Sequence, residues 1–346
     1  MQNSLKTINL FSGVGGIEAG MEKAGFSTLI GNEIDSVVGQ TYSLNHPTPL
    51  VVDDVANVTA VKILEALGIH SGSSWAVDDI QGQILTGGFP CQPFSVAGHR
   101  KGFEDERGNV FWDILRLVQE LKPEVVFLEN VKNLKQHDAG RTFEIIIQAL
   151  EGKIPAPNGM RLEKPYKVKS AILNAKDFGV PQNRERIYIL AFRDEAVAER
   201  FEFPTGHHRA SGKEWGSHIQ VHEKYIYTSE RPFYNQLKTE IDEAGVFYQW
   251  RRQYVRKNKS DLCPTLTANM GLGGHNVPLI LSSQGIRKLT PKECFELMGM
   301  PDIMLPEAQP DSKLYKQAGN SVVVPVIEAI ARNLSSSLFN NLEHST

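Results

Sequence analysis

The chain has 346 residues, 41% hydrophobic and 22% charged, which is typical of a globular protein large enough for two domains. Its formal net charge of −3 argues against a protein that coats nucleic acid by charge alone. The three cysteines form no CxxC pair, so no disulfide framework, zinc ribbon or other metal site is expected. Without a membrane-length apolar run or a signal pattern, we expect an intracellular protein with no membrane partner.

Strand and helix patterns alternate along the first half of the chain. Apolar, strand-like runs at residues 7–11, 27–33, 49–55, 83–88, 123–130 and 186–192 are separated by helical patterns at 17–24, 36–45, 61–68, 110–121 and 142–152. This alternation predicts an α/β fold, a doubly wound and mostly parallel sheet with helices on both faces. Ligands of such folds bind at the carboxyl ends of the strands, where most of the unusual residues of this chain fall.

The pattern breaks after Phe192. Residues 194–285 are polar, with scattered glycines and aromatics and no clean period, which predicts a smaller, irregular second domain. Order returns at "LTPKECFELMG", where Thr290 can cap a helix, Pro291 suits its first position and Glu293 completes a capping box. The chain then continues with a turn and an apolar helix in "YKQAGNSVVVPVIEAIARNL".

Three strand ends indicate a nucleoside-bearing cofactor. The glycines of "FSGVGG", residues 11–16, allow a tight turn at a helix N-terminus and a close approach of the backbone to a ligand. Glu33 ends the next strand, where a carboxylate accepts from ribose hydroxyls, and Asp54 ends the third, where it can meet an adenine edge. The chain contains no GKS or GKT sequence, so a phosphate-binding P-loop is excluded. The glycine loop by itself does not choose between a dinucleotide and S-adenosyl-L-methionine (SAM).

A cysteine lies at the end of the fourth strand, in "GGFPCQPFSVAG". The glycine- and proline-rich loop holds Cys91 where oriented backbone amides can stabilise a thiolate, the nucleophilic form. The glycine-rich and charged residues that follow, 98–108, suggest a mobile lid. Glu129 ends the neighbouring strand and is a candidate proton donor or acceptor beside the thiol. No histidine is placed for a Cys–His hydrolase pair, which weighs against protease chemistry.

Two basic motifs have both a structural and a functional interpretation. In "PQNRERIYIL", alternation puts Arg184 and Arg186 on one face of a strand, where they form surface salt bridges or hold a polar base or a phosphate. The run "RRQYVRKNK", residues 251–259, is a solvated surface or a phosphate contact.

In their order along the chain, these motifs resemble those of the DNA (cytosine-5) methyltransferase family. "FSGVGG", "NEID" and "DDV" are similar to its cofactor motifs, "GFPCQPFS" to its nucleophile motif, "ENV" to its catalytic-acid motif and "QNRER" to its QxRxR motif. "RKLTPKECFELMGMPD" and "QAGNSV" are similar to its two C-terminal motifs. The resemblance covers nearly the whole chain, and the compact length resembles the bacterial type II restriction–modification branch.

The resemblance implies a Rossmann-like, SAM-dependent methyltransferase domain at residues 1–193 and 320–346. It also implies a target recognition domain at 194–290, a hinge at 291–319, and S-adenosyl-L-homocysteine as the product of the cofactor, with no metal. The cofactor-binding residues that it implies are Phe11, Ser12, Gly13, Val14, Gly16, Glu33, Ile34, Asp54, Val55, Pro90, Val110, Asn320, Ser321 and Val322.

The implied reaction flips a cytosine out of double-stranded DNA and methylates its carbon 5 through a covalent cysteine adduct. The implied catalytic residues are Cys91, Glu129, Arg184 and Arg186, and the implied substrate-binding residues are Phe89, Gln92, Ser95, Ala97, Gln182 and Thr265. The resemblance further implies a cytoplasmic monomer encoded by a bacterium or phage. A cognate restriction endonuclease would share its DNA site without forming a stable complex.

Three other functions remain open from the sequence. Within the family, the second hypothesis is methylation of cytosine in transfer RNA, although the sizeable second domain ending in "CPTLTANMG" favours DNA. An NAD-dependent oxidoreductase would use the glycine loop and Glu33 but would leave Cys91 and Glu129 without a role. A pure DNA-binding module would use none of the catalytic set. The DNA recognition sequence is not readable from the chain.

Overall fold

The computed structural model of this chain describes residues 5–69, 80–90, 110–206, 211–212, 215, 219–251, 253–258, 260–272 and 276–339. The predicted nucleophile Cys91 and the predicted substrate-binding residues Gln92, Ser95 and Ala97 lie outside the described residues, as does the predicted lid. The chain divides into two compact units, residues 1–173, 185–204 and 327–346 in the larger and residues 174–184 and 205–326 in the smaller.

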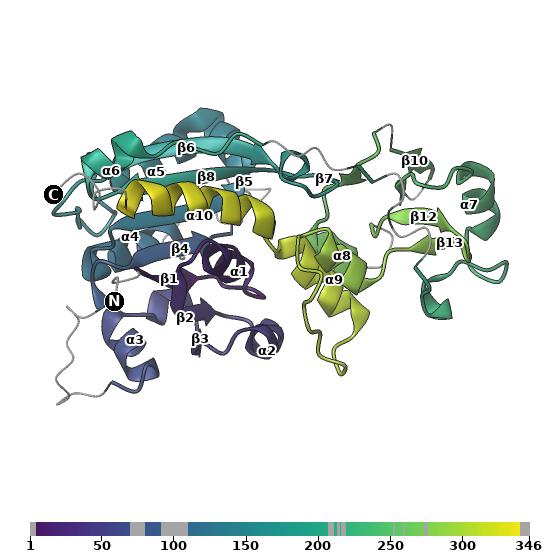
Figure 1. Cartoon of the computed structure of the whole chain (residues 1–346), viewed down its shortest axis with the longest axis horizontal. Coiled ribbons are helices and arrows are strands. Elements are labelled where there is room, and N and C mark those ends of the chain that lie inside the picture. Colours follow the sequence, from purple (N-terminus) through teal and green to yellow (C-terminus); the bar gives the residue numbers. More distant parts are fainter. Residues whose placement is uncertain are drawn as a thin grey trace. The chain divides into compact units, whose positions relative to one another are not determined.

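The described part of the larger unit forms a seven-stranded sheet in the order β3-β2-β1-β4-β5-β8-β6 (Figure 1). Strands β1 to β5 pair in parallel, and β8 runs antiparallel to β5. The predicted fold, a mostly parallel α/β sheet, is therefore confirmed. The strands are β1 Lys6–Leu10, β2 Ser27–Glu33, β3 Leu50–Val52, β4 Ile84–Gly88, β5 Val125–Val131, β6 Lys167–Asn174 and β8 Glu185–Phe192.

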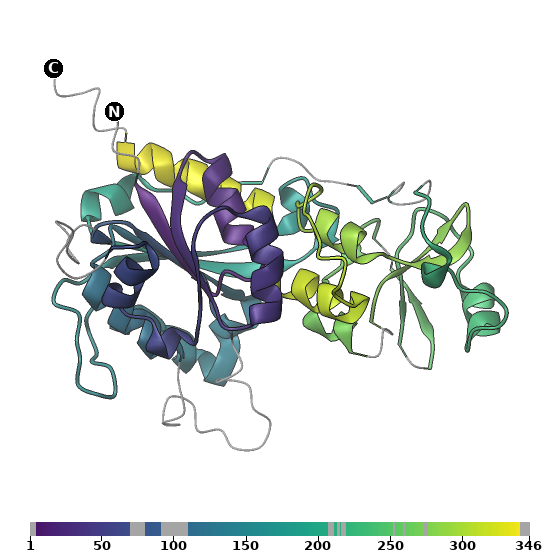
Figure 2. The same ribbon diagram turned by 90° about the horizontal axis from the view of Figure 1, so that it is seen from below.

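Helices cover both faces of this sheet, as predicted (Figure 2). Helices α1 and α10 lie on one face and α3, α4 and α5 on the other. Gly20 permits the close approach of α1 and α10, because a Cβ there would lie only 2.5 Å from the Cβ of Ile327. The helices of this unit are α1 Gly16–Lys23, α2 Ser36–Asn45, α3 Ala60–Ala66, α4 Val110–Leu121, α5 Arg141–Leu150, α6 Glu195–Arg200 and α10 Val324–Phe339, with short 3-10 turns at Val55–Asn57 and Lys132–Gly140.

One hydrophobic core of the larger unit lies between the sheet and helices α3, α4 and α5. Apolar side chains recur at helical spacing in α4, so that Phe111, Ile114, Leu115 and Val118 all face inward and are buried. They pack against alternate residues of the central strands, such as Leu85 of β4. This packing fixes the position of each strand end at the edge of the sheet.

The stretch Asp311–Phe339 is long and apolar enough to cross a membrane by composition, but half of its most apolar window is buried inside the protein. Ile327, Ile330 and Leu334 of α10 have no exposed surface. Helix α10 is therefore a core helix of the larger unit.

The smaller unit contains a second, antiparallel sheet in the order β10-β9-β12-β13. The sequence pattern predicted a smaller irregular domain here but did not predict these strands, because strands of three or four residues are too short to show an alternating period. Apolar residues of this sheet pack against α7. The elements are β7 Gln182–Asn183, α7 Tyr234–Glu240, β9 Tyr248–Trp250, β10 Val255–Lys257, β11 Cys263–Pro264, β12 Leu279–Ser282, β13 Gly285–Lys288, α8 Pro291–Glu296 and α9 Asp311–Asn320, with 3-10 turns at Ala175–Asp177, Glu223–Tyr225 and Ala268–Gly271.

The division into units differs from the predicted domain boundaries at four places. Residues 174–184 belong to the smaller unit because β7 pairs with β11, Gln182 opposite Cys263. The predicted hinge, residues 291–319, and residues 320–326 of the predicted catalytic domain also belong to the smaller unit. Residues 194–204 of the predicted recognition domain belong to the larger unit. The functional roles predicted for these domains stay predictions.

A buried ion pair joins β13 to α8 in the smaller unit. The guanidinium of Arg287 donates to both carboxyl oxygens of Glu293, at 2.7 and 2.8 Å, and neither side chain is more than 3% exposed. Glu293 also completes the predicted capping box, since its carboxylate accepts from the amide of Thr290 while the Thr290 hydroxyl accepts from the amide of Glu293. Breaking a buried pair by removing one partner is costly because the other charge stays buried.

Arg287→Met is expected to lower the free energy of unfolding of the smaller unit by about 3–5 kcal/mol, because Glu293 then lacks its counter-charge. Hydrogen exchange of amides in β12, β13 and α8 measures this loss. The control is Lys224→Met, which removes an exposed pair with Asp311 and should cost under about 1 kcal/mol. Equal losses in the two variants would contradict the importance of the buried pair.

Candidate active site

The strand order reverses between β1 and β4. Chain connections lead from β1 outward to β2 and β3, and then back across to β4 on the other side of β1. In an open parallel sheet this reversal leaves a crevice outside the carboxyl ends of the two strands, and ligands bind there. The "FSGVGG" loop follows β1, and Phe89 and Pro90 follow β4, so the sheet brings these two segments to one place.

The glycine loop is a tight turn that begins in the left-handed region. Phe11, Gly13 and Gly15 have positive φ angles of 54°, 58° and 90°. The amide of Gly15 donates to the carbonyl of Ser12, at 2.8 Å. Position 15 requires glycine, because a Cβ there would lie 1.9 Å from the His46 ring, whereas a Cβ at Gly13 would have only the Phe11 carbonyl at 4.0 Å. The His46 ring therefore fills the space where a side chain at position 15 would lie, whereas the corresponding space at Gly13 is open.

Glu33, at the end of β2, binds the glycine loop directly. Its two carboxyl oxygens accept from the amides of Gly13, at 3.0 Å, and Asp35, at 2.9 Å. An ionised carboxylate has about four lone-pair sites, so it retains acceptor capacity toward a ligand's hydroxyls. The next residue, Ile34, is 63% exposed, an unusual exposure for an apolar side chain of this size. A carboxylate beside an exposed apolar surface fits a ribose and a base.

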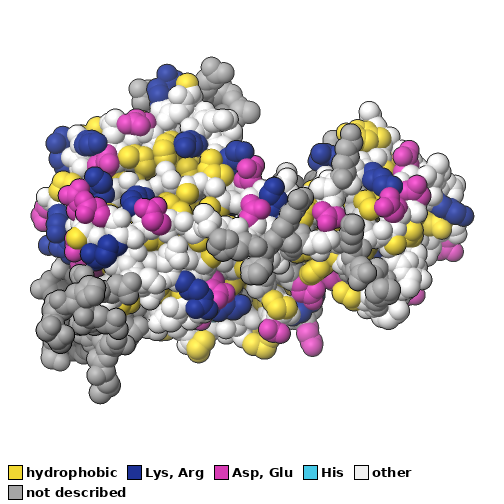
Figure 3. Space-filling model, turned by 45° about the horizontal axis from the view of Figure 1, so that its top comes forward, with side chains coloured by type: hydrophobic (Ala, Val, Ile, Leu, Met, Phe, Trp, Pro, Cys, Tyr) yellow, Lys and Arg dark blue, Asp and Glu magenta, His cyan; other side chains and the backbone are white. Residues whose placement is uncertain are grey.

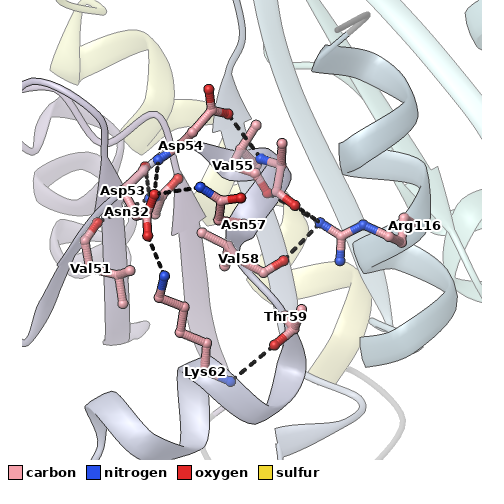
Figure 4. Close-up of polar contacts among 11 residues, drawn as sticks. Asn32, Val51, Asp53, Asp54, Val55, Asn57, Val58, Thr59, Lys62 and Arg116 are labelled. Atoms are coloured by element: carbon pink, nitrogen blue, oxygen red, sulfur yellow. Dashed lines mark hydrogen bonds and ion pairs between the residues drawn. The ribbon is translucent and has the colours of Figure 1, made fainter.

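Asp54 lies in a loop after β3 that a polar network holds in place (Figure 4). The side-chain amide of Asn32 donates to the carbonyls of Val51 and Asp53, at 3.0 and 2.8 Å. The carboxylate of Asp53 accepts from Asn57 and pairs with Lys62, and these contacts lower the pKa of Asp53 to about 2. Asp54 is exposed, and its carboxylate accepts from the amide of Ala56, at 3.0 Å.

Arg116 of α4 holds the other end of this loop (Figure 4). Its guanidinium donates to the carbonyls of Val55 and Val58, at 3.1 and 2.8 Å, and to the carboxylate of Glu120, at 2.7 Å. Val55 is itself buried. Arg116 was not predicted as a site residue, because only the folded chain brings a residue of α4 beside the loop that follows β3.

Glu129 and Arg186 meet at the carboxyl edge of the sheet. Because β8 is antiparallel to β5, the start of β8 lies beside the end of β5, and Val131 pairs with Arg186. The Nε of Arg186 lies 3.1 Å from Oε1 of Glu129, and both side chains are largely buried. Glu129 also stands opposite Gly88, the last residue of β4. Two residues, Phe89 and Pro90, separate Gly88 from Cys91.

Asn130 fixes the turn that leads to the predicted nucleophile. Its side-chain amide donates to the carbonyl of Phe89 at 3.0 Å, and its side-chain oxygen accepts from the amide of Val131 at 2.8 Å. The predicted substrate-binding residue Phe89 is buried and packs against Phe111, with ring centroids 6.4 Å apart. Pro90 is exposed and Val110 half-buried, at the two ends of residues 91–109. Asn130 is a positioning residue that the sequence analysis did not single out.

The smaller unit holds the remaining predicted site residues. The guanidinium of Arg184 is buried and donates to the carbonyls of Leu266, Gly319 and Ser321, at 2.6, 3.1 and 2.7 Å. The buried Gln182 donates to the carbonyl of Leu297 and accepts from the amide of Leu266. The hydroxyl of Thr265 donates to the carbonyl of Asn183, at 2.6 Å. Of the C-terminal residues, Asn320 is exposed and Ser321 and Val322 are buried.

A carboxyl group that the sequence analysis did not single out lies beneath the glycine loop. Glu18, in the first turn of α1, has no exposed surface, and neither of its carboxyl oxygens has a hydrogen bond to a described residue. Burial raises its pKa to about 7, with the Ser12 hydroxyl opposing the rise and Glu22 and Glu33 adding to it. The sequence signal for the burial of Glu18 is its position three residues before Met21, which puts the two side chains on the buried face of the helix.

Charged side chains of both signs are interspersed on the face shown in Figure 3, within each unit, in keeping with the net charge of −3. Charge alone does not single out a nucleic-acid-binding surface on this face.

The chain is similar to known proteins along nearly its whole length. A family model described as C-5 cytosine-specific DNA methylase matches residues 5–336. The Type II methyltransferase M.Bsp6I of Bacillus sp. (strain RFL6) is 46% identical over 342 residues, covering 96% of this chain and 99% of that protein. The Type II methyltransferase M.HhaI of Haemophilus parahaemolyticus is 34% identical over 349 residues, covering 96% and 95%.

Solved structures share the fold at lower identity. A DNMT2 mutant of Spodoptera frugiperda aligns with a TM-score of 0.68 and 18% identity, covering 96% of this chain and 100% of that chain. The methyltransferase EhMeth of Entamoeba histolytica aligns with a TM-score of 0.68 and 20% identity, covering 97% and 99%. These two comparisons concern the fold alone.

Arg116→Met is expected to weaken binding of SAM, the predicted cofactor, about tenfold, because the carbonyls of Val55 and Val58 lose a charged donor and the Asp54 loop loosens. Isothermal titration calorimetry measures the dissociation constant. The matched control is Arg193→Met, since Arg193 donates to the Lys122 carbonyl at the opposite edge of the sheet. If both variants bind SAM equally well, Arg116 does not position the loop.

Proposed function

We propose, from the premise that this chain belongs to the family of C-5 cytosine-specific DNA methylases, that Cys91, Glu129 and Arg186 carry its reaction at the carboxyl edge of the large sheet. The enzyme transfers a methyl group from SAM to carbon 5 of cytosine in DNA. The family predicted from the order of the motifs is confirmed by the match over residues 5–336 and by relatives of nearly equal length.

The groups around the β1–β4 crevice fit SAM. The open backbone above Gly13 leaves room for a ligand, which a side chain there would fill. We assign Glu33 to the ribose hydroxyls, Ile34 to the face of the adenine and Asp54 to the adenine amine, with the loop of residues 11–16 as the floor of the site. When bound, SAM supplies an electrophilic methyl group. The cofactor contacts predicted for Val55, Pro90, Val110, Asn320, Ser321 and Val322 stay predictions.

The chemistry explains why this reaction needs a thiol and an acid. Carbon 5 of cytosine is a poor nucleophile until a group adds to carbon 6. The thiolate of Cys91 forms a bond to carbon 6, and the ring electrons move toward carbon 5, which accepts the methyl group. Glu129 holds nitrogen 3 and stabilises the charge that develops there. Loss of the carbon-5 proton to a base then restores the double bond and expels the thiolate.

The duplex blocks this addition, because both faces of each base are stacked. Enzymes of this family therefore rotate the target cytosine out of the helix, at a cost of a few kcal/mol. The single observation that carries our assignment is the contact between Glu129 and Arg186, at 3.1 Å, opposite the strand end that leads to Cys91. We assign Arg186 to the carbonyl side of the flipped base.

The smaller unit is our candidate for DNA recognition. Its Arg184 donates to three carbonyls, which supports a positioning role in place of the predicted contact with the base. This arginine joins the "TLTAN" segment at Leu266 to the "AGNSV" turn at Gly319 and Ser321. Gln182 accepts from the amide of Leu266, and Thr265 of the same segment donates to the carbonyl of Asn183, so both are assigned the same task. The basic run at residues 251–259 is assigned to DNA phosphates.

We further propose that the protein acts in the cytoplasm as a monomer and protects host DNA from a cognate restriction endonuclease. The similar proteins from Bacillus and Haemophilus are both named type II methyltransferases. Bisulfite sequencing of plasmid DNA from cells that express the chain identifies the methylated site. A lack of methylated cytosine would contradict this role.

Incubation with duplex DNA that carries 5-fluorocytosine at the target site is expected to trap a SAM-dependent covalent complex, because fluorine cannot leave as the carbon-5 proton does. Denaturing gel electrophoresis and peptide mass mapping locate the bond at Cys91. Cys91→Ala should form no complex while it still binds DNA. A complex that persists in Cys91→Ala would contradict the assignment of the nucleophile.

Glu129→Gln is expected to lower the rate of methyl transfer by at least about a hundredfold, which is typical of the loss of a general acid or base. The dissociation constant for SAM should change less than about twofold. Glu185→Gln is the matched control, since Glu185 starts the same strand as Arg186 and pairs with the exposed Lys132. Equal losses of SAM binding and methyl transfer in Glu129→Gln would place this carboxylate in the cofactor site instead.

A further inference from the structure

The hairpin of β9 and β10 has two different faces. Trp250 pairs with Val255, and both side chains are buried in the apolar cluster that includes Tyr248 and residues of α7. Gln249 pairs with Arg256, and the alternation of side chains along a strand turns these two to the opposite face. Arg256 is exposed and Gln249 is half-buried. The hairpin is therefore apolar on the face toward α7 and polar on the other.

The sheet is covered on its second face where helix α8 packs. Because Leu279 of β12 pairs with Tyr248, the next residue, Ile280, lies on the face of Gln249. Ile280 and Arg287 are buried there, and Arg287 bonds α8. The edge strand β10 instead exposes its side chain on this face (Figure 1).

Three side chains on the polar face of the hairpin supply hydrogen-bond donors. The Nη2 of Arg251 donates to Oε1 of Gln249 at 3.1 Å, so Arg251 lies on the same face. Gln249 keeps the two donors of its amide nitrogen. The guanidinium of Arg256 forms no hydrogen bond or ion pair with a described residue. Its five N–H donors are therefore available to a ligand.

This set of donors matches the acceptors of one base. None of the described side chains on this face of β9 and β10 is a carboxylate. In the major groove of DNA, guanine presents two acceptors, N7 and O6, whereas the amino groups of cytosine and adenine need an acceptor from the protein. The planar fork of an arginine donates to N7 and O6 together, and a two-stranded ribbon is narrow enough to enter that groove.

The position of Arg256 on a strand favours a base contact over a phosphate contact. Its backbone is fixed by the pairing of β10 with β9 and by the burial of Val255. Contacts with bases need a side chain held by a rigid element, whereas phosphate contacts carry no sequence information. The next residue, Lys257, faces the other way and pairs with Asp242 and Glu243. Of the two cations of β10, Arg256 is thus the one that no described carboxylate holds.

We propose that Arg256 contacts a guanine of the recognition sequence in the major groove, donating to its N7 and O6, with Arg251 and Gln249 beside it on the polar face of the hairpin. This inference rests on the proposed role of the smaller unit in DNA recognition. Within the basic run at residues 251–259, it assigns Arg256 to a base in place of a phosphate. It predicts that the methylated site contains a guanine whose N7 is needed for tight binding.

The test measures binding of the protein to short duplexes by fluorescence anisotropy at one salt concentration, because the salt changes every affinity for DNA. The duplexes carry the site that bisulfite sequencing identifies, with 7-deazaguanine in place of each guanine in turn. This base pairs as guanine does but has a carbon–hydrogen group in place of N7. For the wild type, the dissociation constant should rise about tenfold at one of the guanines, because Arg256 then loses one of its two bonds.

Arg256→Ala should bind the unmodified duplex at least about tenfold more weakly and should no longer distinguish guanine from 7-deazaguanine at that position. Since Arg256 is exposed and its guanidinium is unbonded among the described residues, this variant should fold, which its melting temperature checks. The matched control is Lys257→Ala, from the same strand but the other face. It should weaken binding to every duplex alike and keep the wild-type preference for guanine.

A uniform loss of affinity in Arg256→Ala, with the preference for guanine retained, would make Arg256 a phosphate contact and would overturn this inference alone. The same holds for a wild type that binds every 7-deazaguanine duplex as tightly as the unmodified one. A wild type that binds no duplex and methylates no DNA would overturn the proposed function and this inference with it.

Discussion

The site depends on one topological constraint, the reversal of strand order between β1 and β4. Because β1, β4 and β5 are parallel and adjacent, their carboxyl ends meet at one edge and bring together the glycine loop, the turn to Cys91 and Glu129. The antiparallel β8 adds Arg186 to the same edge, since its first residues lie beside the last residues of β5. No single loop could place residues so distant in sequence with this precision.

Amide and guanidinium side chains hold the loops in place by donating hydrogen bonds to backbone carbonyls. Asn32 and Arg116 do so for the Asp54 loop, Asn130 for the turn after β4, and Arg184 for segments of the smaller unit. Buried carbonyls need such partners, and a charged or amide donor from a rigid helix or strand also fixes the loop in place.

Much of the fold was predictable, because the central strands are apolar runs and the helices between them carry apolar residues at helical spacing. Strand β6 was missed because its side chains are half-buried with no regular alternation, and the sheet of the smaller unit because its strands are short. The motifs predicted Glu33, Asp54, Glu129 and Arg186 at the sheet edge, where they lie. Arg116, Asn130 and the burial of Glu18 depend on contacts between distant segments, which local sequence patterns do not encode.

The most direct test of this account is a crystal structure of the protein with S-adenosyl-L-homocysteine and duplex DNA that contains 5-fluorocytosine, trapped after methyl transfer. We expect the adenosyl group at the carboxyl ends of β1 and β2, beside Glu33 and Asp54. We also expect the flipped base bonded to Cys91 through carbon 6, with nitrogen 3 within hydrogen-bond distance of Glu129. A base bound away from Glu129, or a cofactor outside the β1–β4 crevice, would contradict the central claim that the strand order assembles the active site.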